Sequence, residues 1–277
     1  MRPAPSDALL ALDLGASKFA YCLSRTGVPG RVTSLPLPVY GDTVREFEVI
    51  ARALADDAST YGGVPVLCAA PSLSGDGVVE SWPNRPHWRG FPLLTAVQDV
   101  LGSRPATVGD GDAIALADAG GRPGAYYISL YFGTGVAGGI VRDHDIVRLG
   151  PLNSELGHIP TDPGGAHCSC GLRGCFQTVW IAWREGRAGR DEFTANLARL
   201  VATLSRVFPA CTISLGGRFF SEDRAKAAAL LDDVLPAVGA SPWAPTLRLS
   251  DAGVHGPLTG ALIIARRLRN SDARRTD

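Results

Sequence analysis

Lysine is almost absent from this chain of 277 residues: Lys18 and Lys226 are the only two among 27 basic residues, and the rest are arginines. Acidic residues also number 27, so the formal net charge is zero. A chain without a basic excess lacks the electrostatic footprint with which proteins bind nucleic acids or anionic membranes. The sequence therefore predicts no nucleic-acid partner and no membrane-surface role.

Long apolar runs are missing as well. No stretch approaches the roughly 18 apolar residues that a membrane span needs. The first 15 residues, MRPAPSDALLALDLG, lack the apolar core and cleavage site of a signal peptide. We therefore expect no membrane partner and a location in the reducing cytoplasm, where clustered cysteines bind metal more often than they form disulfides.

Several nucleotide-binding signatures are missing too. The chain has neither a G-x-x-x-x-G-K-[ST] loop nor the H-R-D and D-F-G pair, which excludes the P-loop and protein-kinase families. The pattern G-x-G-x-x-G does occur, at Gly133, Gly135 and Gly138. A dinucleotide-binding fold requires a helix directly after the third glycine. Here β-branched residues and an Asp-His-Asp turn follow, which predicts a hairpin and favours a role in binding the phosphates of a mononucleotide.

Cysteines are concentrated in one loop. Cys168, Cys170 and Cys175, half of the six in the chain, lie within eight residues, and the glycines between them let the backbone fold back. Zinc takes four ligands from thiolates and imidazoles. His158 is the favoured fourth ligand over His167, because adjacent side chains of an extended backbone point apart. Ordinary buried cysteines or a redox pair are the alternatives, although the spacing is not Cys-x-x-Cys. A closed site of this kind is structural.

Strands and helices alternate along the chain, which predicts an α/β fold. Both halves open with a strand, a glycine turn and a second strand. Further strands are expected at residues 64–71, 211–217 and 246–250, and helices at 43–54, 92–102, 192–208 and 257–268. Thr43 and Glu46 predict a capping box at the first helix. The repetition predicts two similar domains that face each other across a cleft, with glycine turns whose N–H groups suit phosphate oxygens.

These motifs resemble those of the ROK family, which comprises bacterial sugar kinases and repressors, and the resemblance covers nearly the whole chain. LALDLGASK resembles the family's first phosphate motif and GTGVAGG its second. GDGDAIALAD resembles the segment that carries the catalytic base, and SLGGRF resembles the adenosine-side glycines. ELGH followed by CSCGLRGC resembles the zinc-and-sugar motif, which is the family's most specific signature.

The resemblance implies the actin-like ATPase (ribonuclease H-like) fold, with two similar domains around a cleft. The first domain would comprise residues 1–118 and 258–277, because the last helix returns to it, and the second would comprise residues 119–257. The implied activity is that of a sugar kinase, a transferase that uses ATP and Mg²⁺ and holds a structural zinc ion. We expect a homodimer.

The resemblance also assigns roles to residues. Asp110 is the expected general base; a helix cap is the structural alternative, and Asp112 is the next candidate for the base. Asp13 is expected to hold Mg²⁺, and a turn-forming Asp is the alternative. Lys18 suits a phosphate contact or a solvated strand position equally. The full set of expected nucleotide and Mg²⁺ residues is Asp13, Gly15, Ser17, Lys18, Gly133, Thr134, Gly135, Gly216 and Gly217.

The expected sugar pocket departs from the family pattern. Its residues are Gly109, Asp110, Glu155, His158 and Gln177. Gly109 replaces an Asn and Gln177 replaces a Glu, and both losses weaken hydrogen bonding to glucose. The predicted acceptor is therefore a modified hexose, an amino sugar such as kanosamine, or a cyclitol, phosphorylated at the 6-OH. An ordinary glucokinase and a degenerate sugar-binding protein are the alternatives. A repressor is disfavoured, because the first motif begins at residue 9 and leaves no room for a helix-turn-helix.

Overall fold

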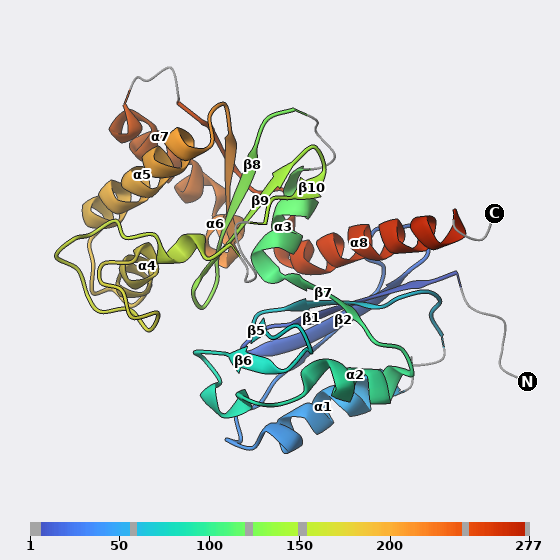
Figure 1. Ribbon diagram of the computed structural model, residues 1–277. Coiled ribbons are helices and arrows are strands. Elements are labelled where there is room, and N and C mark those ends of the chain that lie inside the picture. Colours follow the sequence, from blue (N-terminus) through green and yellow to red (C-terminus); the bar gives the residue numbers. More distant parts are fainter. Residues whose placement is uncertain (1–6, 56–59, 120–123, 149–153, 240–243, 275–277) are drawn as a thin grey trace, which may run out of the picture. The chain divides into compact units, whose positions relative to one another are not determined.

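The computed structural model describes residues 7–55, 60–119, 124–148, 154–239 and 244–274 (Figure 1). The chain divides into two compact units, one formed by Met1–Ala113 with Pro257–Asp277 and the other by Ile114–Gly256. Each unit is built on a five-stranded mixed sheet. Among the described residues, no helix combines the length and the apolar character that crossing a bilayer would require.

The first sheet has the strand order β3-β2-β1-β4-β7. Its first three strands form an antiparallel meander, and β4 and β7 continue the sheet parallel to β1. The bounds are β1 Leu9–Leu14, β2 Lys18–Ser24, β3 Val32–Pro36, β4 Val66–Ala69 and β7 Ala106–Gly109. All six residues of β1 are buried, as expected for a central strand covered on both faces.

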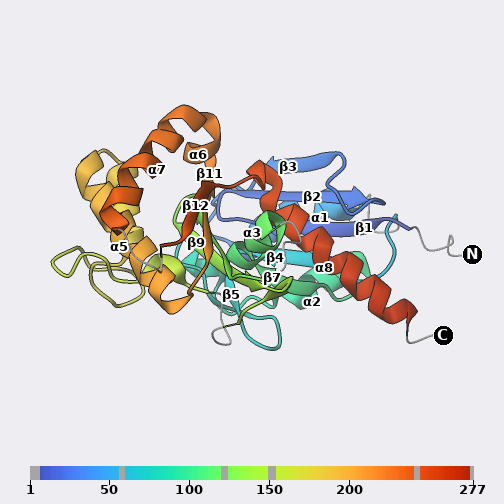
Figure 2. The ribbon, with the colours of Figure 1, turned by 90° about the horizontal axis from the view of Figure 1, so that it is seen from above.

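Helices cover both faces of the first sheet. α1 (Thr43–Ala55) and α2 (Leu93–Leu101) lie on one face, and α8 (Gly256–Ala273) lies on the other (Figures 1 and 2). The rest of this unit comprises β5 (Ser72–Leu73), β6 (Val79–Ser81) and the 3₁₀ helix η1 (Pro86–Trp88). All three helices were predicted from the sequence.

The predicted capping box of α1 is wrong. The side chain of Asp42 accepts the N–H of Arg45 at 3.2 Å, while Thr43 donates its hydroxyl to the carbonyl of His87. Glu46 is fully buried and forms an ion pair with Arg85, and its Oε1 accepts the N–H groups of Tyr40 and Gly41, which precede the helix. A distant buried cation therefore overrides the local capping pattern.

The second sheet repeats the first. Its strand order is β10-β9-β8-β11-β12, with an antiparallel meander followed by two strands parallel to the central one. The bounds are β8 Tyr127–Phe132, β9 Val136–Arg142, β10 Asp145–Ile146, β11 Thr212–Gly217 and β12 Thr246–Leu249. The predicted hairpin turn is confirmed: Asp143 and His144 lie between β9 and β10 with φ values of 50° and 71°.

Two long helices, α5 (Arg190–Val207) and α7 (Arg224–Val238), lie side by side against the second sheet (Figure 2). They contribute to a core that contains Leu200 and Leu204 of α5 and Ile213 of β11. The remaining elements are α3 Asp110–Ala119, η2 Leu156–His158, α4 Phe176–Arg184, α6 Arg218–Glu222 and η3 Gly253–His255.

Candidate functional site

The first glycine turn joins β1 to β2. The N–H of Gly15 donates to the carbonyl of Lys18 at 3.0 Å, which closes the turn. Ser17 accepts the N–H of Leu37 at 3.0 Å, and Ala16 accepts the Nε–H of Arg85 at 2.7 Å. The carbonyls of Ala16 and Ser17 are therefore fixed by the rest of the fold.

Asp13 ends β1 beside this turn and is only 5% exposed. Burial raises its pKa from 3.8 to about 6, and the nearby Lys18 partly offsets this rise. The Lys18 Nζ lies 3.9 Å from Oδ2 of Asp13. A buried carboxylate next to a phosphate-type turn has the hard oxygen donors that Mg²⁺ prefers.

Asp110 lies at the same edge of the sheet as Asp13. The strands β1, β4 and β7 are parallel, and their register aligns Asp13 with Cys68 and Cys68 with Val108, two residues before Asp110. Burial raises the pKa of the Cys68 thiol well above 9.0, and the negative charges of Asp13, Asp110 and Asp112 raise it further. The structure thus gathers three carboxylates around one buried thiol.

Two of these carboxylates were candidates for the base. Asp110 is the first residue of α3, and its Oδ1 accepts the N–H of Gly111 at 2.8 Å. Its side chain is half-buried, whereas Asp112 is 4% exposed. A base must reach the proton that it removes, so the exposure favours Asp110. Gly109 precedes it as the last residue of β7.

The second glycine turn, Gly133 to Gly135, joins β8 to β9. The N–H of Gly133 donates to the carbonyl of Gly135 at 2.9 Å. Strand β9 begins directly after this turn at Val136 and includes Gly138 and Gly139. Gly138 is needed there because a Cβ would come within 2.6 Å of Leu156.

Gly216 and Gly217 end β11, the counterpart of β4 in the second sheet. Gly217 has a φ of 110°, and a Cβ at this position would lie 2.1 Å from the carbonyl oxygen of Phe132. A Cβ at Gly216 would lie 2.8 Å from that of Ser250. The two glycines line a small pocket within the second unit together with Phe220, Ser221, Ser250 and Gly253. No larger residue fits at either glycine without moving the backbone.

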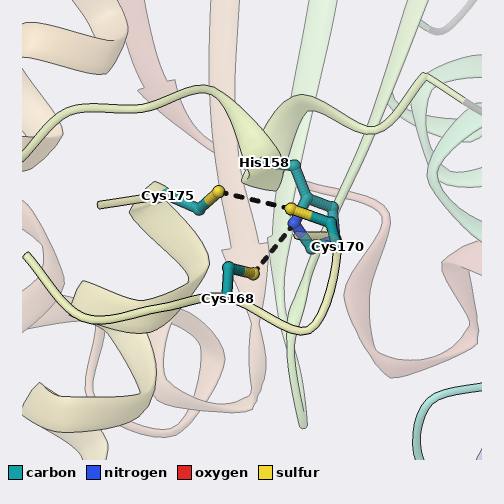
Figure 3. A group of neighbouring side chains, drawn as sticks. All are labelled: His158, Cys168, Cys170 and Cys175. Atoms are coloured by element: carbon teal, nitrogen blue, oxygen red, sulfur yellow. Dashed lines mark hydrogen bonds between the residues drawn. The ribbon is translucent and has the colours of Figure 1, made fainter. Parts of the chain in front are cut away.

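The cysteine loop brings His158, Cys168, Cys170 and Cys175 together, with their ligand atoms all within 4.8 Å of one another (Figure 3). The Nδ1 of His158 lies 3.3 Å from the sulfur of Cys168, and the sulfurs of Cys170 and Cys175 are 3.5 Å apart. His167 is exposed and is not part of the cluster.

These four residues fit a zinc ion. Zn–S bonds of about 2.3 Å place two sulfurs of a tetrahedral site about 3.8 Å apart, close to the separation between Cys170 and Cys175. Burial and the neighbouring thiols raise the pKa of Cys175 to about 12. Three thiolates this close together require a cation to compensate their charge. The donor set therefore suits a closed, structural zinc site.

Glycine geometry explains how the loop closes. Gly171 and Gly174 both have positive φ values, 92° and 68°. A Cβ at Gly174 would lie 1.6 Å from the carbonyl oxygen of Asp162, because this carbonyl packs directly against the glycine. The predicted folding back of the backbone at these two glycines is confirmed.

Glu155 and His158 flank the cluster. Glu155 directly precedes η2 and is half exposed, and its Oε2 lies 3.7 Å from Nε2 of His158. With Nδ1 directed at a cysteine sulfur, Nε2 is the nitrogen left to meet a polar group. Both side chains come from one short segment, which explains why the family motif is contiguous in sequence.

Gln177 lies in the first turn of α4, two residues after Cys175. Its Oε1 accepts the N–H of Val136 at 3.2 Å, so it contacts the base of the second glycine turn. The same helix contributes Trp180 and Arg184 to this turn. Neither α4 nor these two contacts were predicted from the sequence, although the spacing of three and seven residues from Gln177 is the repeat of a single helix face.

Comparison with known proteins identifies relatives of this chain. The sequence model described as the ROK family matches residues 9–181. A kanosamine kinase of Amycolatopsis mediterranei is 37% identical over 178 residues, which are 61% of this chain and 58% of that protein. A glucokinase of Thermotoga maritima is 29% identical over 212 residues, which are 73% of this chain and 66% of that protein. The chain thus spans less than two thirds of the length of these relatives.

A solved structure covers more of the chain. The ROK hexokinase of Thermus thermophilus matches with a TM-score of 0.70 and 25% identity, over 95% of this chain and 99% of its own. Neighbours of this kind have the actin-like ATPase fold, and the duplicated sheet order described above is consistent with it. The predicted fold class is therefore confirmed.

Proposed function

Because the chain belongs to the ROK family, we propose that it is a sugar kinase, which transfers the γ-phosphoryl group of ATP to a hydroxyl group of a sugar. One observation carries this proposal: Asp13 and Asp110 lie at the same carboxyl edge of β1, β4 and β7, beside a glycine turn. A phosphoryl transfer to an alcohol needs this combination of a carboxylate for Mg²⁺, a carboxylate base and a phosphate-binding turn.

Asp110 is the proposed general base. It accepts the proton of the attacking hydroxyl as the phosphoryl group moves in line toward that oxygen. Asp13 is the residue that would hold Mg²⁺, which supplies charge compensation for the phosphates when it is bound. The partial exposure of Asp110 and the burial of Asp13 suit these two roles.

The glycine turns are the proposed phosphate and nucleotide contacts. Gly15 closes the first turn, because its own N–H donates to the carbonyl of Lys18. Backbone N–H groups of Ser17 and Lys18 in the first unit and of Thr134 and Gly135 in the second are the proposed donors to phosphate oxygens. The pocket lined by Gly216 and Gly217 is the proposed contact for the adenosine.

Glu155 and His158 are the proposed sugar ligands in the second unit. The zinc cluster supplies rigidity when the metal is bound, because it fixes the ring of His158 through Nδ1 and leaves Nε2 for a sugar hydroxyl. The metal takes no part in proton or phosphoryl transfer in this proposal.

The acceptor that we propose is an amino sugar such as kanosamine or another modified hexose, phosphorylated at the 6-OH. Gly109 presents no side chain beside the base. The Oε1 of Gln177 already accepts a backbone N–H, so its uncharged amide offers the sugar two N–H donors and one remaining lone pair in place of a carboxylate. Hydrogen bonds between a carboxylate and the hydroxyls of glucose are worth roughly 1.5 to 3 kcal/mol each. The 37% identity to a kanosamine kinase supports the same acceptor class.

An ordinary glucokinase is the second candidate, supported by the similarity to the Thermotoga glucokinase. A coupled assay of ADP release should be run on kanosamine, glucosamine, N-acetylmannosamine, fructose, a valiolone-type cyclitol and glucose, with phosphorus NMR to locate the ester. We expect kanosamine or a related sugar to give the highest kcat/KM. If glucose reaches about 10⁴ M⁻¹s⁻¹ and no other sugar exceeds it, the second candidate is correct. ADP release with none of them would indicate a degenerate sugar-binding protein.

We also propose that the chain works as a homodimer. Light scattering coupled to size exclusion tests this directly, and a mass near the 29.0 kDa of one chain would contradict it.

A further inference from the structure

Helix α4 contacts the second glycine turn through three side chains on one face. Trp180 donates its Nε1–H to the carbonyl of Gly133 at 3.1 Å. A guanidinium N–H group of Arg184 donates to the carbonyls of Gly133 and Thr134 at 3.2 and 2.7 Å. Gln177 accepts the N–H of Val136 at 3.2 Å. Three hydrogen bonds thus hold the carbonyls of this three-residue turn, and a fourth holds Val136 directly after it.

The direction of these bonds determines where the turn's N–H groups point. In a trans peptide the C=O and the N–H point in opposite directions. The carbonyl of Gly133 belongs to the same peptide plane as the N–H of Thr134, and the carbonyl of Thr134 belongs with the N–H of Gly135. Because α4 takes both carbonyls, both N–H groups point away from the helix. No described residue accepts either of them.

Glycine at position 133 leaves the turn open. A Cβ at Gly133 would meet nothing within 4 Å, and its φ is not in the left-handed region. Neither packing nor backbone strain therefore requires glycine at this position, whereas a ligand that approaches the backbone would. At Gly135 the situation differs, because a Cβ would lie 2.7 Å from Oε1 of Gln177 and would displace that side chain.

The first unit repeats this arrangement. Arg85 donates its Nε–H to the carbonyl of Ala16 at 2.7 Å, which directs the N–H of Ser17 away from Arg85 by the same peptide geometry. Arg85 lies on the segment before η1 and Arg184 on α4, so two unrelated elements supply the same contact. Because an arginine donates to a turn carbonyl at both glycine turns, we infer that this contact serves the function that the two turns share.

We propose that Arg184 is a positioning residue for nucleotide binding: it orients the N–H groups of Thr134 and Gly135 toward the phosphates without contacting the sugar. This inference rests on the proposed function, since it takes the second turn as a phosphate site. The side chain of Arg184 is about one third exposed, and its guanidinium also lies 3.6 Å from the carboxylate of Glu185. The surrounding core does not depend on it, and substitution should leave the fold intact.

The test compares Arg184→Met with Arg187→Met. Arg187 lies three residues further along the chain, its side chain is 61% exposed, and the described contacts of its guanidinium are with Glu185 alone. Isothermal titration should measure the affinity for a non-hydrolysable ATP analogue with Mg²⁺, and separately for the sugar. We expect R184M to weaken nucleotide binding about tenfold, the order expected for losing a hydrogen bond from a charged donor. The sugar affinity and melting temperature of R184M should stay at the wild-type values. R187M should match the wild type in nucleotide affinity, sugar affinity and melting temperature. The nucleotide affinity of Arg184→Lys should lie between those of R184M and the wild type.

Amide hydrogen exchange supplies a readout without ligand. The peptide that contains residues 133–136 should exchange faster in R184M than in R187M. Wild-type nucleotide affinity in R184M would overturn the inference, and so would an equal loss of sugar and nucleotide affinity, which indicates general loosening. A wild-type chain that binds no nucleotide would overturn the proposed function as well, so the two failures are distinguishable.

Discussion

The imidazole Nε2 of His158 lies 3.7 Å from the Oε2 of Glu155, while its Nδ1 faces a cysteine sulfur on the other side of the ring. One histidine therefore links the metal cluster to a carboxylate that is half exposed. Anything that displaces the ring from the cluster also moves its Nε2 away from the carboxylate of Glu155. This relationship makes the proposed metal site and the proposed sugar site parts of one unit of structure.

The first prediction concerns the choice of histidine. His158→Ala should lose the zinc and the activity, because it removes one of four ligands from a closed site. His167→Ala should retain about one zinc per chain, since His167 is exposed outside the cluster. Elemental analysis by plasma mass spectrometry measures both. The reverse ranking would show that His167 is the ligand.

The second prediction concerns the base. Asp110→Asn should lower kcat by about 10² or more, the usual contribution of a general base, and should leave zinc content and nucleotide affinity unchanged. Asp112→Asn is the matched comparison two residues along α3. Steady-state kinetics would assign the base to Asp112 if only that variant lost turnover.

The third prediction concerns the cost of burying Asp13. Burial raises its pKa to about 6, so at pH 8 the ionised carboxylate destabilises the metal-free protein. The stability that a raised pKa provides is present below about pH 3.8 and is lost as the pH rises through 6. Asp13→Asn should therefore raise the free energy of unfolding at pH 8 by up to about 3 kcal/mol. At pH 4 the same substitution should raise the free energy of unfolding by less. It should also abolish Mg²⁺-dependent activity. Urea unfolding measures this, with the exposed Asp99→Asn as a control that should change nothing.

The fourth prediction concerns acid stability. Burial alone raises the pKa of Glu46, but hydrogen bonds from Trp88, His87, the Tyr40 N–H and Arg85 outweigh it and lower the pKa to about 2. A lowered pKa contributes stability that is present above about pH 4.5 and is lost as the pH falls toward 2. We expect the free energy of unfolding to decrease by about 3 kcal/mol over that range on account of this group.

Two variants of α1 test this acid dependence. Glu46→Gln should unfold more easily at pH 7, by about 3 to 5 kcal/mol, because it leaves the buried Arg85 without its counter-charge. Its stability should then change less between pH 4.5 and 2 than that of the wild type. Glu48→Gln removes an exposed partner of Arg52 and should keep the wild-type acid profile. An unchanged profile in E46Q would show that other groups govern acid unfolding.

Local sequence determined much of the fold. Apolar and β-branched runs predicted the central strands β1 and β8, and α1, α2, α5 and α8 were predicted to within a few residues at most ends. The strand-turn-strand opening of each half was predicted, whereas the strand order of the sheets came from the structure. Ligand types at short spacing predicted the cysteine cluster with His158, because four residues on one folded-back loop come together without help from distant parts of the chain.

Tertiary structure alone decided the contacts between distant segments. The sequence marks Arg85 and Arg184 only as two of 25 arginines, yet Arg85 is fully buried 69 residues from Ala16, and Arg184 reaches Thr134 across 50 residues. The sequence pattern predicted that Glu46 caps a helix, but in the fold Glu46 forms an ion pair with Arg85. Periodicity reports which face of an element is apolar, whereas the partner of a buried charge depends on which elements pack against each other. The sequence thus determined the elements and the local metal loop, and packing determined which side chains support the two glycine turns.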